Sequence, residues 1–236
     1  GTMFIYEYDA NGNLVKKTTG DIKTNYAYNK ANEVTRVENF SGANLLGRYT
    51  YAYSADGNRI GEKQDGGAEK SYRYDAAGRL SYETFKDGDT DIRYSYYYDA
   101  NGNRAMMGAN GDENYDVTYT YDKNNRLTKQ VKTEVNQETE TVYSYDKNGN
   151  RTSKLERIYA ADTDAQMGLE TKSEMAAVYE YDSRNRLQKA YTNSGITQYS
   201  YTADGLRREK KTATATINYI WNGTNLAMIL RIMCMT

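Results

Sequence analysis

One pattern recurs ten times along the chain and constrains its fold more than any other feature. Each copy begins with Tyr-x-Tyr or Tyr-x-Trp, has a short polar residue at its fourth position, and has Gly or Asn at its seventh. The units begin at Tyr6, Tyr26, Tyr51, Tyr72, Tyr96, Tyr119, Tyr143, Tyr179, Tyr199 and Tyr219. Because a period of 20 to 50 residues is typical of repeat architectures, the pattern predicts one array of about ten units over residues 1–236.

The paired aromatic residues of each unit predict a β-strand. The third position is Tyr nine times and Trp221 once, so two rings lie two residues apart in every unit. Residues i and i+2 share one face of a strand, whereas in a helix they lie on nearly opposite sides. Most units also carry a second turn signal, such as "DGD" at Asp87 or "NSG" at Asn193. Two turns per unit predict strands of about six to eight residues in an antiparallel meander.

The fourth and seventh positions predict the turn itself. The fourth residue is always Asp, Asn, Ser or Thr, whose side chain accepts a hydrogen bond from the backbone two residues on. The seventh is Gly or Asn, the residues that adopt positive φ at least cost, as a type I turn followed by a bulge requires. The structural repeat residues are Tyr8, Asp9, Gly12, Tyr74, Asp75, Gly78, Tyr98, Asp99, Gly102, Tyr121, Asp122, Asn125, Tyr145, Asp146, Gly149, Tyr181, Asp182 and Asn185.

Two further features vary between units. Positions eight and nine alternate between Asn-Arg and Arg-Leu from the third unit to the eighth, which indicates a structural period of two hairpins. We expect these arginines to stack on a tyrosine or to pair with an Asp, rather than to bind a ligand. The longest step between units contains residues 157–177, which we predict to be an exposed loop or short surface helix, with a binding loop as the alternative.

The residue types and their spacing argue against several kinds of site. An EF-hand needs Gly at position six and Glu at position twelve of its loop, but counting from Asp9, Asp99 or Asp146 gives neither. Irregular calcium binding between adjacent turns stays open as the alternative. The chain has no His, which removes the usual base of a Ser or Cys nucleophile. Paired carboxylates could form a hydrolase dyad, but each Asp of the repeat already has a turn to hold. We therefore expect no enzyme activity, no metal and no cofactor.

Charge and hydropathy exclude other partners. Thirty-one Lys and Arg residues balance 32 Asp and Glu residues, so nothing predicts nucleic-acid binding. The longest apolar stretch, Leu226–Met235, is about half of the roughly 20 residues that a membrane span needs, and the sequence does not open on a positively charged segment followed by an apolar run. The single cysteine, Cys234, permits no internal disulfide.

The segments "YEYDANGNL", "YRYDAAGRL", "YTYDKNNRL" and "YSYDKNGNR" resemble the YD repeat of the RHS family, over nearly the whole chain. That family includes bacterial polymorphic toxins, the shell components of insecticidal toxin complexes, and teneurins. The resemblance implies a β-ribbon that spirals into a hollow, cocoon-like shell around a toxic C-terminal domain. It also implies a secreted or cell-surface location, and partners in the rest of the same polypeptide or its toxin cargo. The family's Pro- and Asp-containing self-cleavage core is absent here, so we expect a fragment of the repeat array.

The predicted fold class is therefore all-β, with tandem hairpin repeats in a curved or spiral antiparallel sheet. The predicted function is a non-catalytic shell segment, and the alternative is a carbohydrate-binding surface module. The tyrosines outside the repeat would face such a ligand: Tyr49, Tyr82, Tyr94, Tyr97, Tyr115, Tyr159 and Tyr191. An open sheet also exposes its end strands, so we expect edge-to-edge association, either as a two-fold dimer through residues near Leu226 to Met233 or by an end-to-end contact with the strand around Phe4 to Tyr8.

Overall fold

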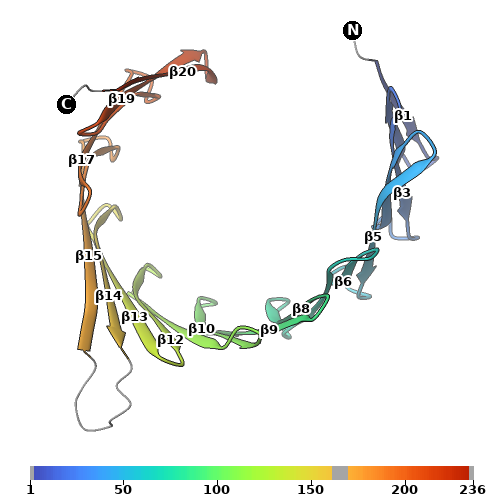
Figure 1. The fold of residues 1–236 in the computed structure, drawn as a ribbon, viewed down its shortest axis with the longest axis horizontal. Helices are drawn as coiled ribbons and strands as arrows, with labels where there is room; N and C mark the ends of the chain where they lie inside the picture. The colour runs from blue at the N-terminus through green and yellow to red at the C-terminus, as the bar shows by residue number, and fades with distance from the viewer. Residues whose placement is uncertain (1–2, 161–169, 234–236) are drawn as a thin grey trace. The chain divides into compact units, whose positions relative to one another are not determined.

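The computed structural model describes residues 3–160 and 170–233, and these residues form strands and turns without any helix. This confirms the all-β hairpin fold. The chain divides into two compact units, Gly1–Asp116 and Val117–Thr236, of which each is a run of antiparallel hairpins (Figure 1). The described part therefore contains no helix that is long and apolar enough to span a membrane.

The first unit is a meander in which each strand pairs with the next one along the chain. Its strands are β1 (Phe4–Tyr8), β2 (Leu14–Thr19), β3 (Ile22–Tyr28), β4 (Val34–Ser41), β5 (Asn44–Tyr53), β6 (Arg59–Gln64), β7 (Glu69–Tyr74), β8 (Leu80–Asp87), β9 (Thr90–Tyr98) and β10 (Arg104–Gly111). The next strand, β11 (Tyr115–Tyr121), spans the boundary between the units.

The second unit continues the same scheme, with sequential antiparallel pairing from β12 to β20. Its strands are β12 (Leu127–Glu134), β13 (Gln137–Tyr145), β14 (Arg151–Ala160), β15 (Glu170–Tyr181), β16 (Leu187–Thr192), β17 (Gly195–Tyr201), β18 (Arg207–Lys211), β19 (Ala215–Asn222) and β20 (Asn225–Met233). In both units the odd-numbered strands carry the paired aromatic residues at their C-terminal ends.

Nine hairpins that begin with an odd-numbered strand have a bulge in the strand that follows the turn. After β1, Tyr8 lies opposite Leu14 and Glu7 opposite Lys16, so the second strand contains one extra residue. The backbone closes through a hydrogen bond from the Gly12 N–H to the Asp9 carbonyl, at 3.1 Å. The seventh residue has positive φ in nine units, between 75° and 88° for Gly and between 58° and 61° for Asn. These are the features of a type I turn followed by a bulge.

The tenth unit departs from this expectation. Asn225 pairs directly with Asn222, and the positive φ of 58° belongs to Gly223 rather than to the seventh residue. Because Gly223 already supplies a left-handed residue, a loop of two residues closes this hairpin. The prediction that Asn225 is the left-handed residue of its turn is therefore wrong.

The predicted loop at residues 157–177 is wrong at both of its ends. Strands β14 and β15 continue into this range, with Arg157 opposite Glu174 and Ala160 opposite Glu170. An ion pair of 2.9 Å joins the Arg157 Nε to the Glu174 carboxylate across the two strands. Cross-strand pairs of opposite charge stabilise a sheet by roughly 0.2 to 1 kcal/mol each, which favours strand over loop here. The remaining residues, 161–169, lie outside the described part.

Burial within the described residues is limited to small or isolated side chains. The buried hydrophobic residues are Ile92, Ala109, Val117, Ala190 and Ala215, and no large side chain is fully buried. Most residues of the strands are half-buried instead, since their side chains cover one another along an uncovered sheet. Stability must then come from contacts between neighbouring strands and turns rather than from a central core.

Candidate functional site

In eight units the aromatic residue at the third position ties its hairpin to the preceding one, and we call this contact the hairpin tie. The side chain at the third position, a tyrosine hydroxyl or the Trp221 indole N–H, donates a hydrogen bond. The acceptor is the backbone carbonyl of the ninth residue of the preceding unit. Donor and acceptor are Tyr28 and Leu14, Tyr53 and Val34, Tyr74 and Arg59, Tyr98 and Leu80, Tyr145 and Leu127, Tyr181 and Arg151, Tyr201 and Leu187, and Trp221 and Arg207, at 2.8 to 3.1 Å.

The tie explains why the third position is never Phe. A phenylalanine would fill the same space but would leave the carbonyl without its donor. The indole N–H of Trp221 performs the same role as a tyrosine hydroxyl, at 2.8 Å from the Arg207 carbonyl. Sequence reasoning found the rings but missed the acceptor. The signal that could have found it is the ring donor that all ten third-position residues share.

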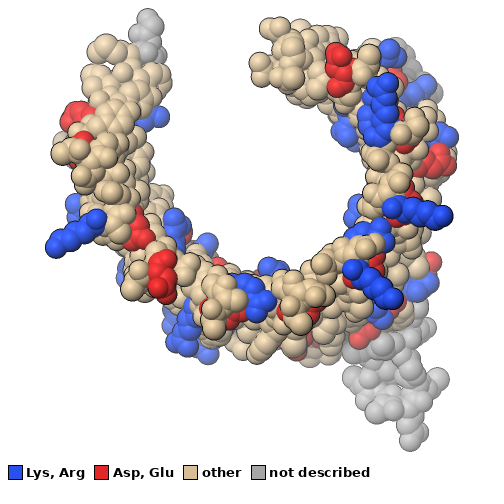
Figure 2. Space-filling model, turned by 180° about the vertical axis from the view of Figure 1, so that it is seen from behind, with Lys and Arg blue, Asp and Glu red and all other residues tan. Residues whose placement is uncertain are grey.

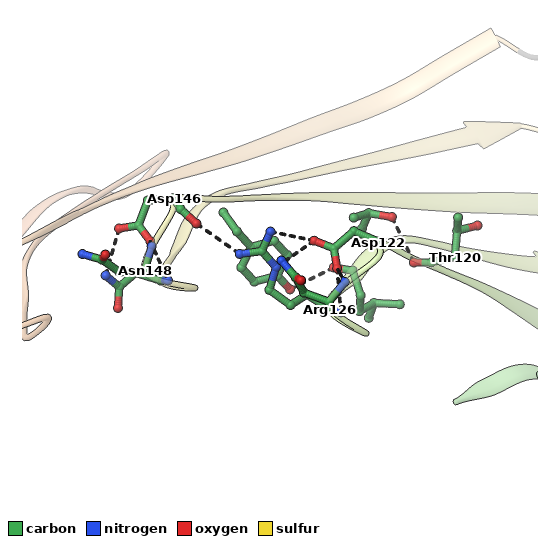
Figure 3. A network of polar contacts seen from close by, with 10 residues as sticks. Thr120, Asp122, Arg126, Asp146 and Asn148 are labelled. Atoms are coloured by element: carbon green, nitrogen blue, oxygen red, sulfur yellow. Dashed lines mark hydrogen bonds and ion pairs between the residues drawn. The ribbon is translucent and has the colours of Figure 1, made fainter. Parts of the chain in front are cut away.

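An arginine at the eighth position covers the tie in three units. Arg126 forms a two-point ion pair with Asp122, its Nε and Nη2 both lying 2.7 Å from Oδ2 (Figure 3). Its guanidinium carbon lies 4.9 Å from the centre of the Tyr145 ring, and its Nη1 donates to the Asp146 carbonyl at 3.1 Å. One side chain therefore bridges two successive turns. Two other arginines make the equivalent contacts. Arg79 pairs with Asp75 and covers the Tyr98 ring, and Arg186 pairs with Asp182 and covers the Tyr201 ring.

The arginines at the ninth position contact a different ring. Arg59 and Arg207 lie over the first tyrosine of their own units, Tyr51 and Tyr199, at 4.6 and 4.9 Å. Cation–π contacts at partly exposed sites contribute roughly 0.5 to 1 kcal/mol. The alternation of Asn-Arg and Arg-Leu thus reflects two ways of covering tyrosine rings.

In two units whose eighth residue is Asn, side-chain amides bridge the turn to the next one instead. Asn13 Nδ2 donates to Asn32 Oδ1 at 2.9 Å, and Asn11 Nδ2 donates to the same oxygen at 3.2 Å. Asn148 and Asn150 bind Asn185 Oδ1 in the same way, at 3.0 and 2.9 Å. Asn at the seventh position therefore does more than tolerate positive φ. The sequence signal is that Asn32 and Asn185 each follow a unit with Asn-Gly-Asn at positions six to eight.

The fourth-position side chains organise their own turns. Asp122 Oδ1 accepts from the backbone N–H groups of Asn124 and Arg126, at 2.8 and 3.0 Å. The same pair of bonds is made by Asp9, Asn29, Asp75, Asp99, Asp146 and Asp182. Ser54 and Thr202 accept only from the N–H four residues on, at 3.2 and 3.1 Å, in the contacts that the structure describes.

Hydrogen bonds from side chains and from backbone N–H groups lower the pKa of the turn carboxyls. For Asp122 and Asp182 the first cause is the hydrogen bond from the paired arginine, and for Asp9, Asp99 and Asp146 it is the hydrogen bond from the eighth-position Asn side chain. A carboxylate with a lowered pKa and several donors is a stable anion and a poor general acid. In Asp9, Asp99 and Asp146 the second carboxylate oxygen, Oδ2, accepts from the side chain of the eighth-position Asn.

The tyrosines that we expected to face a ligand are partly engaged within the sheet. The hydroxyls of Tyr94, Tyr159 and Tyr191 lie 2.8 to 3.5 Å from a glutamate carboxylate: Glu113, Glu140 and Glu180, respectively. The ring of Tyr82 lies beneath the guanidinium of Arg73, at 5.5 Å.

The other three candidates differ from one another in exposure. Tyr49 and Tyr115 are half-buried, whereas Tyr97 is exposed by 57%. Their role in binding a ligand therefore stays a prediction.

Surface charge and side-chain clusters give no sign of a further binding centre in the described chain. Acidic and basic side chains are interspersed over the face that Figure 2 shows, without a patch of one sign. Among residues 3–160 and 170–233, no three His, Cys, Asp or Glu side chains are placed to share a metal ion. An open hollow of about 350 Å³ in the second unit is lined by Met175, Ala177, Tyr179 and Lys154, and the Lys154 ammonium is already paired with Glu156.

Comparison with solved structures identifies the fold. Residues spanning 98% of this chain superpose on the crystal structure of TcdB2-TccC3 with a TM-score of 0.57 and 16% identity. The structure of the Photorhabdus luminescens Tc holotoxin pore matches over 98% of this chain, with a TM-score of 0.55 and 15% identity. This chain has the fold of a segment of the Tc toxin structures. It is the fold that the YD-repeat resemblance implies, so that resemblance is confirmed at the level of the fold.

The match covers only a small part of those proteins. This chain spans 16% of the length of the TcdB2-TccC3 chain and 15% of that of the holotoxin chain. No family model matches the sequence, and no curated protein is significantly similar to it.

Proposed function

We propose that this chain is a non-catalytic wall segment of an RHS-type shell, which encloses or presents a C-terminal toxin or other effector. Two independent observations support the proposal: the YD-repeat pattern of the sequence, and the likeness of the fold to structures of a Tc toxin. On this proposal the repeats curve into part of a cocoon, the protein acts outside the cell, and its partners are the rest of its own polypeptide and the cargo.

The hairpin tie is the observation that carries the proposal. A wall must stay continuous although it has little core, and each tie joins one hairpin to the next by a bond that depends on no side chain of the preceding unit. The acceptor is a backbone carbonyl, so the residues around it are free to vary along the wall. The fourth-position side chains meanwhile hold the turns through hydrogen bonds to the backbone, which supports a structural role for them.

Limited proteolysis of the full-length gene product tests this function. We expect the C-terminal domain to resist protease in the native protein. We expect it to be digested sooner in a Tyr145→Ala variant, which removes a tie. The exposed Tyr97→Ala is the matched control and should leave protection unchanged. A C-terminal domain that is digested at once in the unmodified protein would contradict the proposal.

A further inference from the structure

One strand edge inside the second unit has no neighbouring strand among the described residues. β15 begins at Glu170, but β16 pairs with it only from Ala177 onward and ends at Thr192. On its other side β15 is paired with β14 as far as Glu170. The strands before and after β15 in the chain are thus both present, and the segment from Glu170 to Ala176 outruns the second of them. Its backbone donors and acceptors on that side have no strand to bind.

The side-chain amide of Asn193 lies on this edge as a peptide group would. Its Oδ1 accepts from the Ala176 N–H at 3.4 Å, and its Nδ2 donates to the Glu174 carbonyl at 3.3 Å. One amide therefore makes the two kinds of contact that a neighbouring strand makes. Both distances exceed the roughly 2.9 to 3.0 Å of a typical N–H···O hydrogen bond, so these bonds are weak and a better partner displaces them.

A hollow of about 350 Å³ opens beside the same edge. Its lining includes Ala177, which lies opposite Lys154 of β14 and Thr192 of β16. Met175 and Tyr179 come two residues before and two residues after Ala177 on β15, so their side chains lie on the same face of the sheet. The short side chain of Ala177 among these longer ones leaves room for one apolar group.

The equivalent edge in the first unit is blocked by charge. β5 also begins several residues before its pairing with β6. There the Asp65 N–H donates to the Arg48 carbonyl at 3.0 Å, and the Arg48 guanidinium forms an ion pair of 3.0 Å with the Asp65 carboxylate. Charged side chains prevent further strands from adding to an edge. On β15 the carboxylate of Glu174 is instead paired with Arg157 of β14, and only the Asn193 amide covers the edge.

We propose that the segment Glu170–Ala176, together with the adjacent hollow, binds an extended peptide of another protein as an added strand. The peptide backbone replaces the Asn193 amide at the Ala176 N–H and the Glu174 carbonyl. The peptide residue that lies opposite Met175 directs its side chain to the face on which the hollow opens, because opposed residues share a face. That side chain is apolar and fills the hollow. Main-chain hydrogen bonds supply the affinity of such a site, and the hollow supplies its specificity. This inference does not depend on the proposed shell function.

Binding of a probe peptide, followed by fluorescence anisotropy, tests the proposal. The probe is a blocked, fluorescein-labelled peptide of about seven residues, with leucine at its centre and threonine on both sides. We expect it to bind the unmodified chain saturably, and to bind Asn193→Ala more tightly on the order of fivefold, because the competing amide is removed. The same peptide with aspartate at its centre should bind on the order of tenfold more weakly. A probe that is N-methylated along its backbone should not bind.

Two variants separate the hollow from the backbone edge. Ala177→Leu fills the hollow and should weaken binding of the probe on the order of tenfold. Val178→Leu places the same residue on the opposite face, at a position that is exposed by 48%, and should bind like the unmodified chain. Ala176→Pro removes an outward N–H from the edge and should also weaken binding. Circular dichroism should show the same strand content in all three variants.

Several results would overturn the proposal. One is the absence of binding to both the unmodified chain and Asn193→Ala at millimolar probe, and another is undiminished binding of the N-methylated probe. Equal affinities of Ala177→Leu and Val178→Leu would remove the hollow from the site. Light scattering distinguishes a second copy as the occupant: we expect the same mass for the unmodified chain and Ala176→Pro. A dimer that Ala176→Pro abolishes would assign the edge to self-association instead.

Discussion

Removal of one hydroxyl from the array should show how much a hairpin tie stabilises it. Tyr145→Phe deletes the group that donates to the Leu127 carbonyl at 2.8 Å, and it keeps the ring beneath the Arg126 guanidinium. A neutral hydrogen bond of this kind contributes roughly 0.5 to 1.5 kcal/mol. Both residues are half-buried, so water can partly replace the lost donor. We therefore expect the free energy of unfolding to fall by about 1 kcal/mol.

Urea denaturation followed by circular dichroism measures this change. The midpoint should decrease while the slope stays constant, because the variant exposes no additional surface. Tyr97→Phe is the matched control: it makes the same chemical change in an exposed ring whose hydroxyl has no partner among the described residues, and we expect no measurable effect. If the two variants had equal midpoints, the tie would contribute nothing and the reasoning from its geometry would be refuted.

Further predictions concern the turns and the ionisable groups. Gly102→Val should destabilise the protein by roughly 1 to 3 kcal/mol, measured by thermal melting, because φ at this residue is +85°. Asn185→Gly should also destabilise it, by about 1 kcal/mol, because it removes an amide oxygen that accepts two hydrogen bonds, and an unchanged melting temperature would contradict that bridge. The arginine paired with Asp122 lowers the pKa of its carboxyl in the folded protein. The stability that this carboxylate contributes is therefore present above its unfolded pKa of about 3.9 and is lost as the pH falls further. In thermal melts at acidic pH, the melting temperature of Asp122→Asn should decrease less than that of the unmodified protein. Burial, together with a nearby glutamate, raises the pKa of Tyr96 to about 12. Its contribution to stability is therefore fully present below pH about 10 and is lost as the pH rises to about 12. Ultraviolet titration should show one tyrosine that ionises at high pH and that is missing in Tyr96→Phe.

The local parts of this fold could be predicted because single residues determine them. A Gly or Asn at the seventh position and an acceptor at the fourth specify a turn such as Asp122 to Asn125 without any distant contact. The two aromatic residues of each unit, two positions apart, specify a β-strand in the same local way. Where another glycine competes, as Gly223 does in the last hairpin, the local pattern no longer decides the loop length.

The contacts between hairpins could not be predicted in the same way, because they depend on register. The acceptor for Tyr145 is the backbone carbonyl of Leu127, and no side chain marks it in the sequence. The extension of β14 and β15 was missed for a similar reason, since Arg157 and Glu174 become a pair only after the strands are aligned. The glutamate partners of Tyr159 and Tyr191, Glu140 and Glu180, likewise become neighbours only when the strands are aligned.

Electron cryo-microscopy of the full-length gene product is the most direct test of the proposed shell. The map should show residues 3–233 as consecutive hairpins of one continuous wall, joined by the ties, with the polypeptide of the C-terminal domain enclosed by that wall. A map in which these hairpins form an exposed module, with solvent on both faces and no enclosed polypeptide, would contradict the account.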